Sequence, residues 1–107
     1  MAKLFVRWTE TAARERKEIL KHWTKRNGSA TFAKKLIRLV SRRIAMIQKH
    51  PESFKAVDFP NTRESAMGHF SIFYQVRNRQ LIITAFWDNR QDPKKLLSVL
   101  MKGTSKN

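Results

Sequence analysis

One arginine in this chain follows a strongly apolar segment, and it is the first side chain whose position suggests chemistry. Residues 81–87 read Leu-Ile-Ile-Thr-Ala-Phe-Trp and lead directly into Asp-Asn-Arg-Gln-Asp-Pro, which places Arg90 just beyond the segment. A continuous apolar run of this length predicts a strand that is buried on both faces. An arginine at the end of such a strand is held in a fixed position. We therefore expect a rigid cationic site there.

The charge of the whole chain indicates what such a site would meet. The 107 residues include 23 Lys and Arg against 8 Asp and Glu, a formal net charge of +15, and residues 1–50 hold 14 of the basic side chains with 3 acidic ones. Charged helical faces are often only solvated surface. At this density, however, the pattern favours an electrostatic contact with RNA, DNA or an acidic protein.

Composition limits the class of protein. A chain of 107 residues with 41% hydrophobic residues predicts one globular domain, residues 1–107, with one modest core. The absence of cysteine excludes disulfides, thiolate zinc sites and a cysteine nucleophile. The sequence has no apolar run of about 20 residues and does not open as a signal peptide, so we expect a cytoplasmic protein that makes no membrane contact.

The first half of the chain predicts a strand followed by two helices. Partial alternation over residues 3–8 indicates the strand, and Thr9 is placed to cap the helix that follows. Gly28 ends that helix in a left-handed turn, and Ser29 is expected to cap the next one, which Pro51 terminates. The short link between the helices predicts an antiparallel helical hairpin.

The second half predicts a sheet and a short last helix. Alternation over residues 70–77, with a tight turn at 77–80, predicts a β-hairpin with the strand at 81–87, and residues 63–67 form a weaker third candidate. Asp92 and Pro93 are typical of a helix start, and residues 102–107 are expected to fray. The expected fold is thus α+β, with the N-terminal strand, the helical hairpin on a small antiparallel sheet, and a short C-terminal helix.

Both faces of the predicted sheet carry apolar residues. The helical hairpin can cover only one of them. Either the C-terminal helix folds back over the second face or a partner protein covers it.

Several segments, in this order and at these intervals, resemble the RelE/ParE superfamily of toxins from bacterial type II toxin–antitoxin modules. The resemblance extends from about residue 5 to residue 97. The segments are residues 8–12 (Trp-Thr-Glu-Thr-Ala), Trp23, Pro51, residues 61–63 (Asn-Thr-Arg), residues 70–74 (Phe-Ser-Ile-Phe-Tyr) and residues 86–93 (Phe-Trp-Asp-Asn-Arg-Gln-Asp-Pro).

The resemblance implies a small basic toxin that is neutralised by a cognate antitoxin. It leaves two targets open, because RelE-like members cleave mRNA in the ribosomal A site and ParE-like members inhibit DNA gyrase. No small-molecule cofactor is implied. The histidines of the chain, His22, His50 and His69, show no ligand spacing, so no metal site is expected.

The residues that a RelE-like nuclease would use are incomplete. Cleavage of RNA without a metal needs a cation at the phosphate together with a general acid and a general base. The resemblance implies an arginine at position 71 and a tyrosine at position 96, where this chain has Ser71 and Leu96. The one tyrosine, Tyr74, falls on the expected core face and is interpreted as a packing residue.

The remaining candidates define a rearranged site. Arg90 and Arg63 would stabilise a phosphate, Lys55 would assist from a nearby loop, and His69 would transfer a proton near neutral pH. Trp87 would stack on a base or contact the target. If the target is gyrase, no acid–base pair is needed, and Arg90, Trp87 and the C-terminal segment would form a binding surface.

Structural interpretations of the same residues stay open. The two arginines can form ion pairs with acidic neighbours in the sequence, His69 can be ordinary surface, and Trp87 can belong to the core. The chain can also be a non-toxic nucleic-acid-binding module with the same fold.

Overall fold

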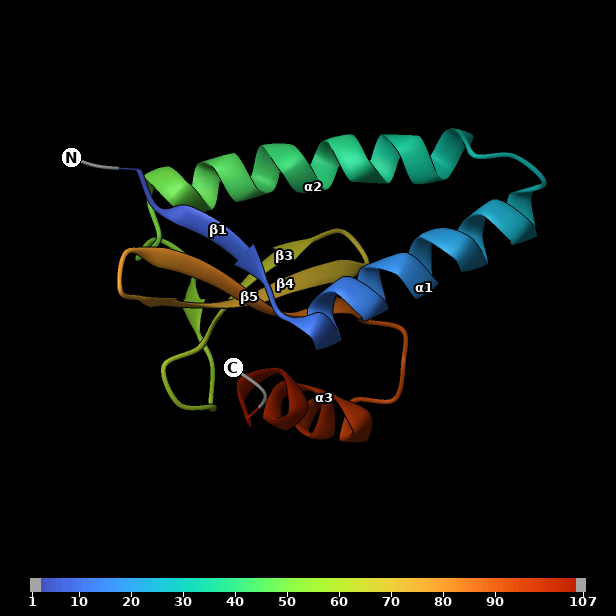
Figure 1. The fold of residues 1–107 in the computed structure, drawn as a ribbon. Coiled ribbons are helices and arrows are strands. Elements are labelled where there is room, and N and C mark those ends of the chain that lie inside the picture. Colours follow the sequence, from blue (N-terminus) through green and yellow to red (C-terminus); the bar gives the residue numbers. More distant parts are fainter. Residues whose placement is uncertain (1–2, 106–107) are drawn as a thin grey trace.

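A five-stranded sheet lies between two helical layers in the computed structural model, which describes residues 3–105 (Figure 1). Two helices that follow one another in the chain cover one face, and the last helix covers the other. The α+β fold class is confirmed. In chain order the elements are β1 (Phe5–Trp8), α1 (Glu10–Asn27), α2 (Thr31–Lys49), β2 (Lys55–Ala56), β3 (Arg63–Met67), β4 (Phe70–Arg77), β5 (Gln80–Asp88) and α3 (Lys94–Ser105).

The ends of the helical hairpin follow the sequence signals with one exception. The Thr9 hydroxyl accepts a hydrogen bond of 3.1 Å from the backbone N–H of the third residue of α1, and Gly28 ends this helix with φ of 68°. Ser29 was expected to cap α2, but this prediction is wrong. The helix begins one residue later, after Ala30, and the Ser29 hydroxyl bonds the hydroxyl of Thr31 instead.

Within residues 3–105 the strand order is β1-β5-β4-β3-β2, where β1 pairs in parallel with β5 and the other neighbours pair antiparallel. The sequence predicted an antiparallel sheet. Because both helices, β2, β3 and β4 intervene before β5, the chain can return to β1 in the same direction, which a tight hairpin cannot do. The short β2 was also not predicted, since it has only two residues and no pattern of its own.

The turn between β4 and β5 and a bulge in β5 fix the register of the central hairpin. Asn78 and Arg79 form the turn with φ of 52° and 62°, the left-handed values that a two-residue hairpin favours. Further along, the pairing skips Thr84. This extra residue places Phe86 on the face under the helical hairpin and Trp87 on the opposite face.

Two hydrophobic clusters fill the spaces on either side of the sheet. The cluster under α1 and α2 has Trp8 and Trp23 half-buried at its edge, and its buried members include Leu36, Val40, Ile44, Ile72 and Tyr74. The second cluster forms beneath α3, which confirms that the C-terminal helix covers the second face. It comprises Phe73, Ala85, Trp87 and Leu100, with Val57, Phe59, Leu96 and Val99 packed against it.

α3 is longer than the sequence indicated. It continues to Ser105 instead of fraying from residue 102, and residues 106 and 107 lie outside the described part of the chain. Between residues 3 and 105, no helix is long and apolar enough to cross a membrane.

Replacing Ile72 with aspartate should abolish folding. The Ile72 side chain is fully buried in the cluster under the helical hairpin, and an unpaired carboxylate there costs several kcal/mol, on the order of the whole stability of a small domain. Ile72→Val is the matched control and should cost about 1 kcal/mol. Thermal unfolding followed by circular dichroism measures both, and a cooperative Ile72→Asp melt close to that of the parent would contradict this core.

Candidate functional site

The loop after β5 is closed by a hydrogen-bonded ion pair between Asp88 and Arg90. One carboxylate oxygen of Asp88, Oδ1, accepts hydrogen bonds from the backbone N–H of Arg90 at 3.0 Å and from its Nε at 2.9 Å. The other, Oδ2, accepts from Nη2 at 2.8 Å. The planar guanidinium matches the carboxylate with two parallel bonds. The structural interpretation of Arg90 as an ion-pair partner is therefore confirmed.

Aromatic rings hold the same guanidinium in place. It lies 4.8 Å from the ring centroid of Trp23 at the end of α1 and 5.7 Å from that of Phe70 at the start of β4. Each contact draws the cation toward the electron-rich face of a ring. Arg90 thus connects three elements at one end of the sheet, while 43% of its side chain stays exposed. A partly exposed cation thus lies at this place, held by an ion pair and two ring contacts.

His69 lies at the same end of the sheet. It is exposed in the turn between β3 and β4, and its backbone oxygen accepts a hydrogen bond of 2.7 Å from Asn89 N–H. Burial alone would raise the pKa of the Asp88 carboxyl, but the hydrogen bonds from Arg90 outweigh it. With the charges of Arg90 and His69 acting in the same direction, the pKa falls below its usual 3.8.

Arg63 and Lys55 lie elsewhere. In the β3–β4 pair, Met67 lies opposite Phe70, the residue that contacts Arg90, and Arg63 lies opposite Tyr74. Arg63 is therefore four positions along β3 from the Arg90 end, about 13 Å. Its Nη1 donates a hydrogen bond of 2.7 Å to the backbone oxygen of Phe54, and Lys55 is exposed on the outermost strand. The four cationic and titratable candidates therefore form two separate groups.

Trp87 belongs to the core. Its side chain is 4% exposed and packs beneath α3. The bulge at Thr84 turns it to this face. The prediction that Trp87 stacks on a base or contacts a target is therefore wrong, because α3 would have to leave the sheet to free the ring.

The two positions that differ from a RelE-like nuclease are structural in this protein. The Ser71 side chain is fully buried, and its hydroxyl donates to Glu64 Oε2 at 2.6 Å and accepts from Asn89 Nδ2 at 2.9 Å. Leu96 packs against the cluster beneath α3. Neither position offers a group that could transfer a proton to a bound phosphate.

Tyr74 is also a structural residue, as predicted. It is 1% exposed, and its hydroxyl donates a hydrogen bond of 2.6 Å to the backbone oxygen of Pro51. Burial raises the pKa of the Tyr74 hydroxyl to about 12, although the nearby positive charge of Arg63 acts against this rise. A hydroxyl with this pKa stays protonated at neutral pH and cannot act as a general base.

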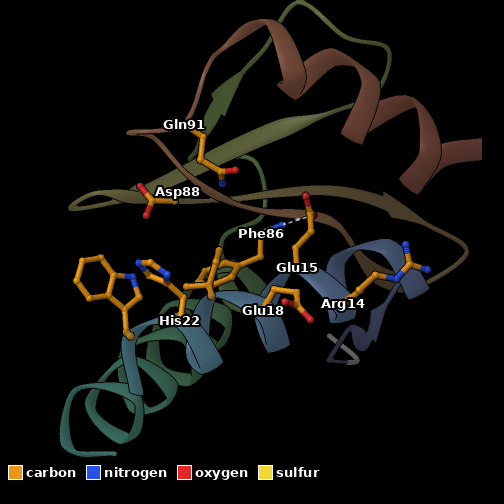
Figure 2. Close-up of a pocket in the computed structure, with 9 residues that line it drawn as sticks. Arg14, Glu15, Glu18, His22, Phe86, Asp88 and Gln91 are labelled. Carbon is orange, nitrogen blue, oxygen red and sulfur yellow. Dashed lines mark hydrogen bonds between the residues drawn. The ribbon is translucent and has the colours of Figure 1, made fainter. Parts of the chain in front are cut away.

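A cavity of about 470 Å³ opens beside the Arg90 loop, between α1 and the end of β5 (Figure 2). It exists because β1 ends at Trp8, so that α1 and not a strand borders the last part of β5. No pattern in the sequence indicates this cavity, since its walls come from segments about 70 residues apart. The lining residues are Arg14, Glu15, Glu18, Ile19, His22, Trp23, Phe86, Asp88 and Gln91.

Glu15, which lines this cavity, has a strongly raised pKa. Figure 2 shows its carboxylate directed at the backbone of Phe86, whose N–H donates a bond of 3.2 Å to Oε1. Burial raises the pKa of Glu15 from 4.5 to about 7, and the hydrogen bond from Phe86 and the charge of Arg14 only partly oppose it. Glu15 thus occupies the hydrogen-bonding position that a neighbouring strand would take.

The arrangement suits binding better than proton transfer. Arg90 is neutralised by Asp88, the Tyr74 hydroxyl is committed to the backbone, and the buried Ser71 has no access to solvent. Within residues 3–105, no group of three or more His, Asp or Glu side chains could hold a metal ion. The accessible features are a partly exposed arginine, an exposed histidine and a cavity with an apolar wall.

One sequence-family model matches most of the chain. The sequence model of the ParE toxin of the type II toxin–antitoxin system parDE matches residues 6–93. A solved structure described as the chromosomal ParDE toxin–antitoxin system from P. aeruginosa superposes with a TM-score of 0.69 at 18% identity, covering 78% of this chain and 94% of that one. At this identity the superposition establishes the fold alone. No protein of curated function matches the sequence.

Removing the Arg90 side chain should raise the pKa of Asp88. In Arg90→Ala the burial of Asp88, the bond from the backbone N–H of residue 90 and the charge of His69 all persist, while the side-chain hydrogen bonds and the charge of Arg90 are lost. The pKa of Asp88 should therefore rise from its lowered value. Arg26→Ala is the matched control, because Arg26 also lies against the Trp23 ring, at 5.4 Å, and its substitution should leave Asp88 unchanged. Carboxyl carbon chemical shifts followed through a pH titration measure this, and equal pKa values in Arg90→Ala and the parent would contradict the ion pair.

Glu15 should make stability depend on pH. The unfolded chain returns the Glu15 pKa to 4.5, so between about pH 4.5 and 7 the folded protein binds more protons than the unfolded chain. The free energy of unfolding should therefore fall as pH rises through this window. Glu15→Gln keeps an oxygen for Phe86 N–H without the charge. Its free energy of unfolding should therefore exceed that of the parent by an amount that grows from pH 5 to pH 8.

Urea unfolding at each pH measures this advantage. Glu18→Gln, an exposed change on the same helix, is the control and should follow the parent across the range. A Glu15→Gln advantage that does not vary with pH would show that this carboxyl does not titrate in the window.

Proposed function

This chain belongs to the ParE toxin family of type II toxin–antitoxin systems, and from that premise we propose that it stops growth by acting on DNA gyrase. The observation that carries the proposal is the buried state of Ser71. At the position where the nuclease branch of the superfamily has an arginine, this protein has a side chain with no exposed surface, bonded to Glu64 and Asn89. An inhibitor that acts by binding needs no group there.

The other candidates for nuclease chemistry support the same choice. A rearranged site would need Arg63, Arg90 and His69 around one phosphate, yet Arg63 lies about 13 Å along the sheet from the other two. A reacting phosphate needs its partners within hydrogen-bond reach. The separation therefore favours a toxin that acts through a binding surface.

We place that binding surface at the end of the sheet that carries Arg90. The Arg90 guanidinium is fixed by Asp88 and Trp23 and so loses little conformational entropy on contact with a partner. The adjacent cavity, with Phe86 and Ile19 in its wall, can receive an apolar side chain. Lys55, exposed on the edge strand β2, stays a second candidate contact, separate from the Arg90 end.

A cognate antitoxin is the second partner that we propose. The structural neighbour from P. aeruginosa is described as a toxin–antitoxin system. The charge of +15 favours an acidic antitoxin segment, whose association would weaken as ionic strength rises.

Two assays on one purified preparation separate the targets. The protein should inhibit DNA supercoiling by gyrase and should leave mRNA intact in a reconstituted translation reaction. Arg90→Ala should weaken gyrase inhibition by about tenfold or more, the usual effect of removing an arginine anchor from an interface. Arg77→Ala, an exposed arginine at the far end of β4, is the matched control and should inhibit as the parent does.

His69→Ala decides whether a histidine takes part in catalysis. A folded His69→Ala variant should stay fully toxic in growing cells. Ribosome-dependent mRNA cleavage that disappears in this variant, with ribosome binding intact, would overturn the gyrase proposal. Growth that continues on expression of the parent would favour the non-toxic nucleic-acid-binding module.

A further inference from the structure

The outer side of α2 carries a continuous stripe of positive charge. The helix contains six basic residues and no acidic one. Lys35, Arg38, Arg42 and Lys49 follow one another at intervals of three, four and seven residues, which at about 100° per residue keeps them within a sector of about 60°. We call these four side chains the α2 stripe.

The α2 stripe points directly away from the protein core. The buried residues of the helix, including Leu36, Val40 and Ile44, occupy the opposite side. In Figure 1, α2 runs along the outside of the molecule with its far side open to solvent. All four stripe residues are exposed. The stripe can therefore approach an extended partner without any rearrangement of the fold.

None of the four charges is used inside the described part of the chain. Between residues 3 and 105, no ion pair or side-chain hydrogen bond involves a stripe residue. The neighbouring Arg43 differs, because its Nη1 donates to Ser65 Oγ at 3.0 Å and to the backbone oxygen of Ala66 at 2.6 Å, which anchors α2 to β3. Of the six basic residues of α2, Arg43 is thus structural, and four of the remaining five form the stripe.

We propose that the α2 stripe binds the phosphate backbone of duplex DNA without reading its sequence. From Lys35 to Lys49 the stripe is about 21 Å long, at 1.5 Å per residue. The major groove of B-DNA is about 12 Å wide and admits a helix. A stripe of this length reaches phosphates on both sides of the groove, while the central arginines lie over it.

The side chains of the helix select a duplex over a single strand. Proteins that bind single strands offer exposed aromatic rings on which the bases stack. The one aromatic residue of α2 is Phe32, which is half-buried and packs against Trp23 with ring centroids 5.4 Å apart. Duplex RNA is also disfavoured, because its major groove is too narrow for side chains to enter.

An acidic protein is the competing partner. Leu39 and Met46, which are 40% and 52% exposed, border one edge of the α2 stripe. A protein interface would bury them, whereas phosphate contacts leave them in water. The helix has no acidic residue that would fix how a protein partner aligns along it. Four positive charges without partners therefore match the uniform negative charge of a duplex better than the mixed charges of a protein surface.

DNA binding by the α2 stripe goes beyond the gyrase proposal and does not depend on it. If both hold, the toxin would contact an enzyme through the Arg90 end of the sheet and the DNA that the enzyme carries through the outer side of α2. Measurement with DNA alone keeps the two proposals separate, since gyrase is absent.

Fluorescence anisotropy with a labelled 24-base-pair duplex of arbitrary sequence tests the proposal. With four phosphate contacts, a plot of the logarithm of affinity against the logarithm of salt concentration should have a slope of about −3.6. The affinity should therefore fall on the order of 100-fold from 50 to 200 mM salt. The variant with Lys35, Arg38, Arg42 and Lys49 changed to Gln should lose most of this slope. A control with Arg77, Lys94, Lys95 and Lys102 changed to Gln has the same net charge, four less than +15, and should retain it.

The proposal would be overturned if the parent does not bind DNA at 50 mM salt, or if both quadruple variants lose DNA affinity equally. It would also be overturned if the parent binds single-stranded DNA or duplex RNA of the same sequence more tightly, or binds polyglutamate as tightly as DNA. A Leu39→Ser/Met46→Ser variant should keep its DNA affinity, and a loss of tenfold or more would assign the stripe to a protein partner. If the quadruple variant fails to melt like the parent, Lys35→Gln/Arg42→Gln should still reduce the slope by about half.

Discussion

The fold depends on the burial of β5 on both of its faces. Most of this strand is buried, and it lies between β1 and β4, so apolar cover must come from two sides. The helical hairpin supplies one cover and α3 the other. Because the strand is fixed this firmly, the residues that follow it leave the sheet at a defined place, and Asp88 can bind Arg90 there with little freedom.

The excess of positive charge divides into structural and free cations. Arg90 bonds Asp88, Arg43 bonds β3, and the guanidinium of Arg16 lies 4.2 Å from the ring centroid of Trp8. These arginines connect helices to the sheet through planar groups that lysine lacks. Four cations without such contacts, Lys35, Arg38, Arg42 and Lys49, lie on the solvent side of α2. The same residue type thus serves architecture near the sheet and long-range attraction on the outer helix.

Ser71 has a structural role at the beginning of β4. Ser71 fills a buried place between Glu64 and Asn89, where its hydroxyl both donates and accepts a bond. A long cationic side chain could not be buried there without the cost of desolvating its charge. The beginning of β4 therefore supports the sheet in this protein.

The sequence by itself determined the helices, the central β-hairpin and the position of Arg90, because periodicity, caps and turn residues act over short distances. The cap at Thr9, the left-handed turn at Gly28 and the apolar run ending at Trp87 are such local signals. Only the tertiary structure decided what each candidate touches. One skipped residue in β5 moved Trp87 into the core, strand pairing kept Arg63 from Arg90, and the early end of β1 opened the cavity in which Glu15 is buried. These outcomes depend on register and on which segments meet in space, and no local pattern in the chain encodes them.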